Sequence, residues 1–162
     1  MAYGIGMRIA DSIGKLFPVI VHPNQKQVLP LAPLFIKNED GQNKQDCEIN
    51  AAKRWVLANK EFLTRHKVIL LGDDLFSRVP FIDLIQTIPD VDYVFVAKPS
   101  SHSYLYQWIE DLDSKNEISH VVQEKAFASH DHHYILVNAV PLNGGEKPPI
   151  ASFLDMLVFN KK

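Results

Sequence analysis

The segment Lys67–Asp74, KVILLGDD, constrains the fold of this chain more than any other part of the sequence. It is a continuous apolar run of strand length, and it ends in two carboxylates. Such a run is typical of a strand that is buried in the middle of an α/β sheet. Open α/β folds bind ligands at the carboxyl ends of their strands, so at least one of Asp73 and Asp74 is expected to emerge where a ligand could bind.

The region before this segment predicts two strands and a helix. Residues 16–21 and 26–36 are rich in β-branched residues and prolines, and predict two adjacent strands that pair antiparallel. Asp46 follows a polar loop and is expected to be the N-cap of a helix. One face of this helix is apolar: Ile49, Ala52, Val56 and Leu63, with Trp55 and Phe62 beside them. Residues 1–15 have three glycines in their first fourteen positions and are assigned to no element.

The region after Lys67–Asp74 is predicted to alternate between helices and strands. Residues 79–88 predict a helix with Pro80 near its start, residues 92–98 a buried strand, and residues 101–112 an amphipathic helix. Three further strands are predicted in VVQEKAF, HYILVNAVPL and SFLDMLVF. The chain is therefore expected to be an α/β core with a β-rich C-terminal third.

Composition narrows the class of protein. A length of 162 residues with 46% hydrophobic residues suits one domain with a core of its own. The net charge of −2 provides no overall basic field that would attract nucleic acid. Cys47 is the only cysteine, so no internal disulfide forms and a reducing cytoplasm is expected. No apolar run is long enough to span a bilayer and no signal peptide is evident, so we expect a soluble protein with no membrane partner.

Several segments together resemble the DDE-type transposases of bacterial insertion sequences. They are ILLGDDLFSRVPFIDLI and YVFVAKPSSHSYLYQWIEDL, with VIVHPNQKQVLPLAPLFI and DGQNKQDCEINAAKRW upstream and YILVNAVPL downstream. The similarity covers roughly residues 17–142. It implies a partial RNase H-like mixed sheet flanked by helices, with a β-rich insertion at the C-terminal end.

The resemblance assigns roles to particular residues. The family pattern of an Asp, any residue, a small residue and an aromatic falls on Asp73–Phe76, where Leu75 departs from the usual Gly or Ala. Asp73 is then the catalytic acid and, with Asp74, a ligand of Mg²⁺. Arg78 and Lys98 are candidates for contact with DNA phosphates, although both also fit ordinary surface charges. On the residues alone, either aspartate could simply end the strand and cap the following turn.

Two further acids of the family are not evident. One is an Asp on the first strand, and the other is a Glu on a helix beyond the insertion. Asp11 follows a strand-like stretch, but its neighbours do not resemble the family's first-Asp motif. The resemblance therefore implies that this chain is a fragment of a transposase. The intact family binds transposon ends, whereas the fragment is expected to be inactive and its Mg²⁺ binding is doubtful.

We expect an undetermined lead-in at 1–15, a partial catalytic core at 16–115 and part of the insertion at 116–162. Exposed sheet edges and apolar surface would favour self-association.

Other residues have competing interpretations. His130, His132 and His133 could form a metal site, but histidines so close together seldom converge on one ion, and a solvated loop is the simpler reading. The helical spacing of Trp55, Tyr104 and Trp108 predicts packing residues, and Cys47 is expected to be a buried helix residue. Two alternative functions stay open: an interaction protein that binds or inhibits an intact transposase, and an unrelated α/β metalloenzyme that uses Asp73, Asp74 and these histidines.

Overall fold

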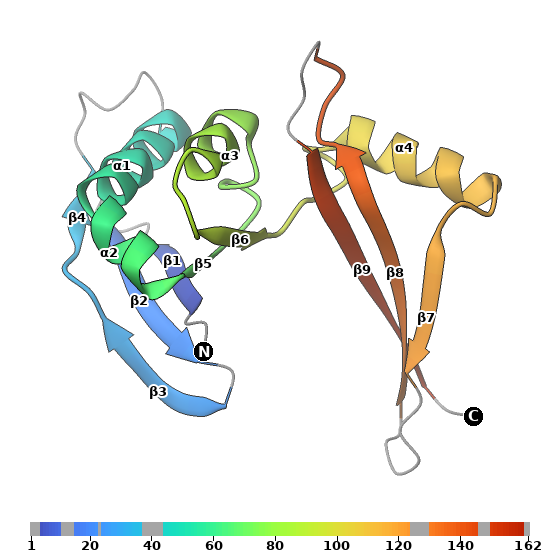
Figure 1. Ribbon diagram of the computed structural model, residues 1–162, viewed down its shortest axis with the longest axis horizontal. Coiled ribbons are helices and arrows are strands. Elements are labelled where there is room, and N and C mark those ends of the chain that lie inside the picture. Colours follow the sequence, from blue (N-terminus) through green and yellow to red (C-terminus); the bar gives the residue numbers. More distant parts are fainter. Residues whose placement is uncertain are drawn as a thin grey trace. The chain divides into compact units, whose positions relative to one another are not determined.

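The computed structural model describes residues 4–10, 15–22, 24–36, 44–123, 130–145 and 150–160 (Figure 1). The chain divides into two compact units, Met1–Lys98 and Pro99–Lys162, and each is described by itself. The boundaries predicted at residues 15 and 115 stay predictions. No helix among the described residues is long and apolar enough to cross a membrane.

The first unit is built on a mixed sheet flanked by helices, as the family resemblance implies. Its strands are β1 (Gly4–Ala10), β2 (Lys15–His22), β3 (Gln25–Pro30), β4 (Leu34–Phe35), β5 (Ile69–Gly72) and β6 (Asp92–Phe95). They lie in the order β3-β2-β1-β5-β6, and β4 pairs with β2. The chain first forms an antiparallel meander, β1 to β3, and then adds β5 and β6 parallel to β1. The predicted antiparallel pair, now β2 and β3, is confirmed.

Strand β1 is the central strand, although no element was predicted for residues 1–15. It pairs along its whole length with β2 and, through Gly4–Gly6, with β5. A Cβ on Gly4 would lie 3.0 Å from Leu71 Cδ1 and 3.2 Å from Val21 Cγ2. The glycine thus lets the side chains of both neighbouring strands close over β1, and pairing on two sides compensates for its weak local propensity.

Three helices cover one face of this sheet. They are α1 (Lys44–Ala58), α2 (Lys60–His66) and α3 (Val79–Gln86), and α3 has its proline in the first turn as predicted. The core between helices and sheet is formed by these buried residues: Ile5, Leu16, Ala52, Trp55, Val56, Leu63, Val68, Leu70, Phe76, Phe81, Ile85, Ile88 and Val91. The prediction of Trp55 as a packing residue is therefore confirmed.

The predicted single helix is two helices, and it starts earlier than expected. Asn59 separates α1 from α2 because its side-chain Nδ2 donates to the carbonyl of Trp55 at 2.8 Å, the same oxygen that its backbone N–H approaches at 3.1 Å. Such local competition for a carbonyl interrupts helices. Helix α1 begins at Lys44, so Asp46 lies inside the helix and the N-cap prediction was wrong. The side chain of Cys47 lies outside the described residues.

Replacing Lys67 by glycine is expected to stabilise the protein. Lys67 ends α2 with φ 47°, in the left-handed region that glycine adopts without steric cost, and its backbone N–H already makes the capping bonds. We expect Lys67→Gly to raise the free energy of unfolding by about 0.5 to 1 kcal/mol in urea titrations. Lys115 ends a helix at φ −94°, so Lys115→Gly should bring no gain. Equal effects of the two changes would contradict this explanation.

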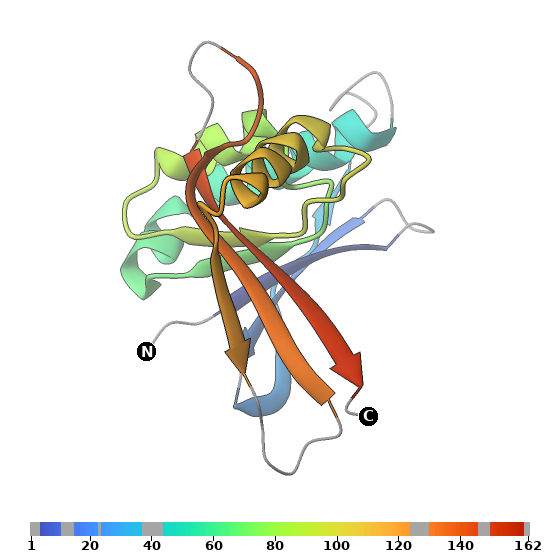
Figure 2. The same ribbon diagram turned by 90° about the vertical axis from the view of Figure 1, so that its right-hand side faces the viewer.

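The described residues of the second unit form a three-stranded antiparallel sheet and one helix. The helix α4 (Ser103–Ser114) precedes β7 (Ser119–Gln123), β8 (His130–Pro141) and β9 (Ile150–Asn160), which lie in the order β7-β8-β9 (Figure 2). The predicted β-rich C-terminal third is confirmed. Helix α4 buries Leu105 and Ile109, whereas Tyr104 and Trp108 are 39% and 40% exposed. Their prediction as packing residues was wrong, since at this spacing they lie beside the buried stripe and Trp108 Nε1 instead donates to Tyr104 Oη at 3.0 Å.

Candidate functional site at the carboxyl edge of β5

Asp73 and Asp74 lie directly after β5, at the carboxyl edge of the first sheet. Strand β5 is parallel to both of its neighbours, the central strand β1 and the edge strand β6. The carboxyl ends of β5 and β6 therefore open onto the same edge, which is where α/β folds place ligands. The sequence prediction placed the two acids at this position.

Asp73 is the more accessible of the two acids. It is exposed. Its Oδ1 accepts a hydrogen bond from the backbone N–H of Leu75 at 3.0 Å, and its carbonyl accepts one from Phe76 N–H at 3.1 Å. These bonds form a tight local turn, which fixes the orientation of the carboxylate. Asp73 is thus a turn residue and still presents its carboxylate to solvent.

Asp74 joins two strand ends. Its Oδ1 accepts a hydrogen bond from the backbone N–H of Lys98 at 2.7 Å, across 24 residues of sequence, and its carbonyl accepts one from Ser77 Oγ at 2.7 Å. The neighbouring bond from Val96 N–H to the Gly72 carbonyl, at 3.1 Å, continues the pairing of β5 and β6 beyond the strands. One oxygen of Asp74 is therefore already used to hold the segment after β6 against the turn.

The buried side chain of Phe76 holds the turn against the core. Its side chain is fully buried, and its ring centroid lies 5.5 Å from that of Phe81 and 6.3 Å from that of Phe95. These separations are typical of aromatic pairs in a core. The aromatic position of the acid motif is therefore a packing residue that fixes the loop carrying Asp73 and Asp74.

Asp74→Ala is expected to destabilise the first unit more than Asp73→Ala. Loss of the Asp74 carboxylate removes a charge-assisted acceptor from Lys98 N–H, worth about 1 to 2 kcal/mol at this partly exposed position. Asp74→Asn keeps an acceptor oxygen and should recover part of the loss. The exposed Asp73 supports only its own turn, so Asp73→Ala should cost about 0.5 kcal/mol. Chemical denaturation of the four proteins measures this order, and a larger loss in Asp73→Ala would contradict it.

The two predicted cationic residues flank this turn. Arg78 is exposed and is the N-cap of α3, where its carbonyl accepts hydrogen bonds from the N–H groups of Phe81 and Ile82 at 3.0 and 3.2 Å. Lys98 is exposed and follows β6. Arg78 thus belongs to the same loop as the acids, and Lys98 is tied to Asp74 through its backbone.

Strand β1 carries no acid at the position where the resemblance expects one. Its sequence, GIGMRIA, has no Asp or Glu. The register pairs Gly6 with Leu71, and continuing it by two residues places the backbone of Arg8 opposite Asp73. Asp11 follows the strand and lies outside the described residues. The central strand therefore contributes no carboxylate beside Asp73.

The described residues contain no group of three or more His, Cys, Asp or Glu side chains that could hold a metal ion. The three histidines expected in a loop instead lie within β8, because that strand already begins at His130. The positions paired with His132 are Gln123 and Val158, and His130 pairs with Asn160. None of these partners is a usual metal ligand, so the register supplies no third ligand. The side chains of the histidines lie outside the described residues.

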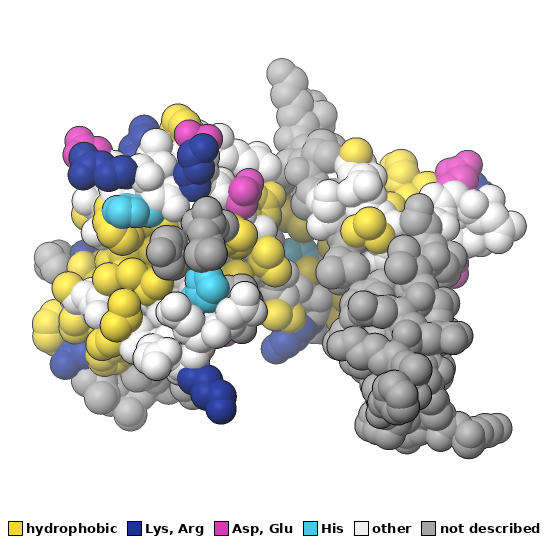
Figure 3. Space-filling model, turned by 60° about the horizontal axis from the view of Figure 1, so that its bottom comes forward, with side chains coloured by type: hydrophobic (Ala, Val, Ile, Leu, Met, Phe, Trp, Pro, Cys, Tyr) yellow, Lys and Arg dark blue, Asp and Glu magenta, His cyan; other side chains and the backbone are white. Residues whose placement is uncertain are grey.

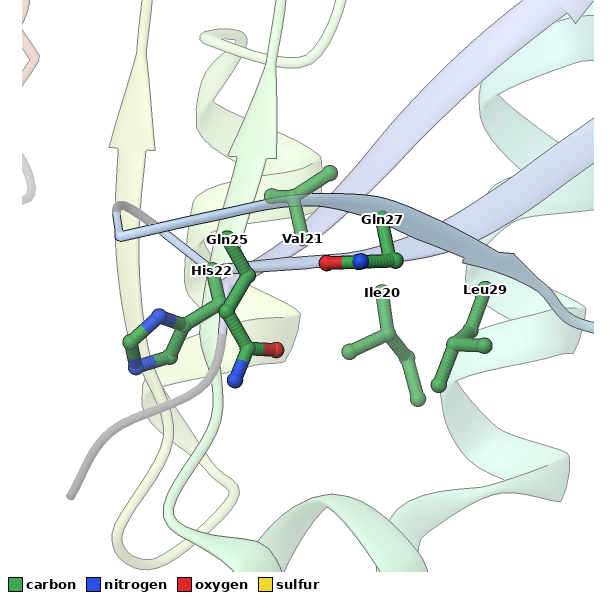
Figure 4. A pocket seen from close by; sticks show the side chains of 6 residues that line it. All are labelled: Ile20, Val21, His22, Gln25, Gln27 and Leu29. Atoms are coloured by element: carbon green, nitrogen blue, oxygen red, sulfur yellow. The ribbon is translucent and has the colours of Figure 1, made fainter.

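A shallow pocket lies elsewhere on the first unit, between β2 and β3. It is lined by Ile20, Val21, His22, Gln25, Gln27 and Leu29. In Figure 4 the side chains of Ile20 and Leu29 lie side by side, and His22 and Gln25 approach each other at the other end. None of its lining residues is one of the predicted site residues, and β1 separates these strands from β5. The pocket is therefore not part of the acid site.

Comparisons of the chain with models of protein families, with curated proteins and with solved structures give no match.

Proposed function

We propose that the chain is part of the RNase H-like catalytic core of a DDE-type transposase, and that it does not cut or join DNA by itself. The observation that carries this proposal is the position of Asp73. It follows a strand parallel to the central strand, in a sheet with the order β3-β2-β1-β5-β6 whose first three strands form an antiparallel meander. The resemblance implies an RNase H-like mixed sheet and makes Asp73 one of its catalytic acids, and a mixed sheet with Asp73 after a parallel strand supports this proposal.

The described residues at this edge do not fit a catalytic pair of Mg²⁺ ions. Such ions need carboxylates that converge from separate elements. Here two adjacent aspartates come from one loop, one oxygen of Asp74 accepts the Lys98 N–H, and β1 offers no acid. The proposal therefore includes no metal-dependent step in this chain.

Strand-transfer assays test the inactivity. Purified protein with Mg²⁺ and a set of labelled DNA duplexes should give no more cleaved or joined product than Asp73→Asn, which serves as the background. Product above that background that depends on Asp73 would overturn the proposed inactivity and would support an active enzyme.

An engineered acid tests the topological part of the proposal. Because continuing the register places Arg8 opposite Asp73, Arg8→Asp should place a second carboxylate beside the first and create a new site for Mn²⁺. Calorimetry should detect this binding, and adding Asp73→Asn should abolish it. Arg8→Asn controls for loss of the cation. Binding that persists without Asp73 would refute the pairing of these positions.

The proposal includes weak contact of this edge with DNA phosphates through Arg78 and Lys98. Both are exposed beside the acid turn. Removing both with alanine should weaken binding to a duplex at low salt by roughly tenfold, and the effect should vanish at high salt. The double change Lys60→Ala, Arg65→Ala on α2 removes the same charge from another surface. Equal weakening by both pairs would favour the alternative of ordinary surface charges.

A second candidate, a non-catalytic interaction protein, is favoured by one observation. The face of the first sheet opposite the helices bears exposed apolar side chains, among them Val28 and Val94 at 54% and 62%. A cooperative melt of the purified chain, together with its binding to an intact transposase, would support this function.

A further inference from the structure

The face of the first sheet opposite the helices carries apolar side chains of β2, β3, β5 and β6. Successive side chains of a strand point to opposite faces. Since Ile5, Leu70 and Tyr93 pack toward the helices, the residues next to them face away. Apolar members of this outer face include Val19, Val21, Val28, Ile69, Leu71 and Val94. Figure 3, which brings the underside of Figure 1 forward, shows hydrophobic side chains gathered over the strands of this unit.

In the middle of the outer face, side chains of the neighbouring strands lie close to the glycines of β1. Strand β1 contributes Gly4 and Gly6 here, and Leu71 Cδ1 lies 3.0 Å from the position that a Gly4 Cβ would occupy. Side chains of β2 and β5 therefore approach the position of a Gly4 Cβ from both sides of β1. Apolar side chains on both sides of a glycine-bearing central strand are suited to packing against another sheet.

Opposite charges stand at the two edges of this face. Lys26 in β3 and Asp92 in β6 are both exposed, and alternation along their strands places both on the outer face. Lys15, which is also on this face, lies over the ring of Phe35 at 4.6 Å from its centroid. The face thus has a cationic edge at β3 and an anionic edge at β6.

We propose that this face binds a second copy of the chain, sheet against sheet, about a twofold axis parallel to the strands. That rotation reverses the strand order, so β3 of one copy lies over β6 of the other. Each Lys26 then faces Asp92 of the second copy, and the contact forms twice, as a twofold interface requires. An axis across the strands would instead place Lys26 on Lys26. The pairing of β2 with β3 shifts register between Ile20 and His22, and in either register the two charges differ in height by at most two positions, about 7 Å, which a lysine side chain can span.

The size of the face predicts a weak dimer. Five strands spaced by about 4.8 Å and about four residues long present roughly 300 Å² per copy. Stable interfaces bury about 800 Å² per partner, so association should depend strongly on concentration. This inference rests on the topology and the edge charges of the sheet, and it does not depend on the proposed function.

Charge reversal in the full chain tests the interface. Sedimentation velocity over a concentration series at low salt should show that the natural chain dimerises. Lys26→Glu and Asp92→Lys should each be monomeric over the same range, because each creates two like-charge contacts. An equimolar mixture of the two variants should dimerise again, since every contact then joins a cation to an anion. High salt should weaken the natural dimer.

Two further variants, Gln27→Glu and Val94→Ser, test which face of the sheet associates. Gln27→Glu adds a charge to the opposite face of β3 and should leave the association unchanged, whereas Val94→Ser, which removes an exposed apolar group, should weaken it. Circular dichroism confirms that each variant is folded. A natural chain that stays monomeric at every concentration would overturn the proposal. So would a mixture of the two reversed variants that fails to associate.

Discussion

Replacing Phe76 by alanine is expected to lower the free energy of unfolding of the first unit by about 3 to 5 kcal/mol, the range for a buried phenylalanine. The side chain of Phe76 is fully buried, and its ring contacts those of Phe81 and Phe95. Its removal deletes aromatic contacts and leaves a cavity beneath the turn that carries Asp73 and Asp74. The loss should therefore affect both the core and the acid site.

The two tryptophans allow this measurement in one unit at a time. Trp55 is buried in the first unit and Trp108 belongs to the second, so fluorescence of Phe76→Ala in a Trp108→Phe background reports on the first unit alone. Phe35 is 61% exposed, and Phe35→Ala should cost at most about 1 kcal/mol, including its contact with the Lys15 ammonium. Similar losses for the two phenylalanines would contradict the assignment of Phe76 as the anchor.

The elements that the sequence predicts well are those whose signal is local. Strand β5 is an apolar run of strand length, and α3 has Pro80 in its first turn and apolar residues at helical spacing. Burial of these elements depends on the same residues that define their pattern. Their prediction therefore required no knowledge of neighbours in space.

The elements that the sequence misses depend on partners far along the chain. Strand β1 contains Gly4 and Gly6, which have little intrinsic preference for a strand, and it forms because β2 and β5 pair with it on both sides. Asn59 divides a continuous apolar stripe through one side-chain bond to a carbonyl. Neither cause appears in the periodicity of hydrophobic residues.

In the candidate site, too, one feature follows from local sequence and another from pairing of distant segments. The position of Asp73 at the end of an apolar strand follows from a run of eight residues. The bond of Asp74 to Lys98 joins residues 24 apart and appears only when β5 and β6 are paired. The sequence alone treats the two aspartates as equivalent carboxylates. Their contacts separate them into one that is exposed in a turn and one that joins two strand ends.

Gly72→Ala is expected to cost the first unit about 1 to 3 kcal/mol through overpacking, although it adds only one methyl group. A Cβ on Gly72 would lie 2.8 Å from Phe76 Cδ2 and 3.1 Å from both Phe76 Cβ and Cγ. Because the ring is fixed among other aromatic residues, it has little room to move away. Either the ring or the turn that carries Asp73 must shift.

A double-mutant cycle isolates this clash. In a Phe76→Ala background the ring is gone, so the added cost of Gly72→Ala should fall by about 1 kcal/mol or more, a non-additivity expected of residues in contact. Gly6→Ala is the matched control, since its nearest neighbour, Val19 Cγ2, would lie at an ordinary 3.4 Å. If the losses in unfolding free energy of Gly72→Ala and Phe76→Ala simply add, or if Gly6→Ala costs as much as Gly72→Ala, then the Phe76 ring does not clash with a Cβ at Gly72. The close approach of Gly72 and Phe76 would then not be what sets the position of the acid turn.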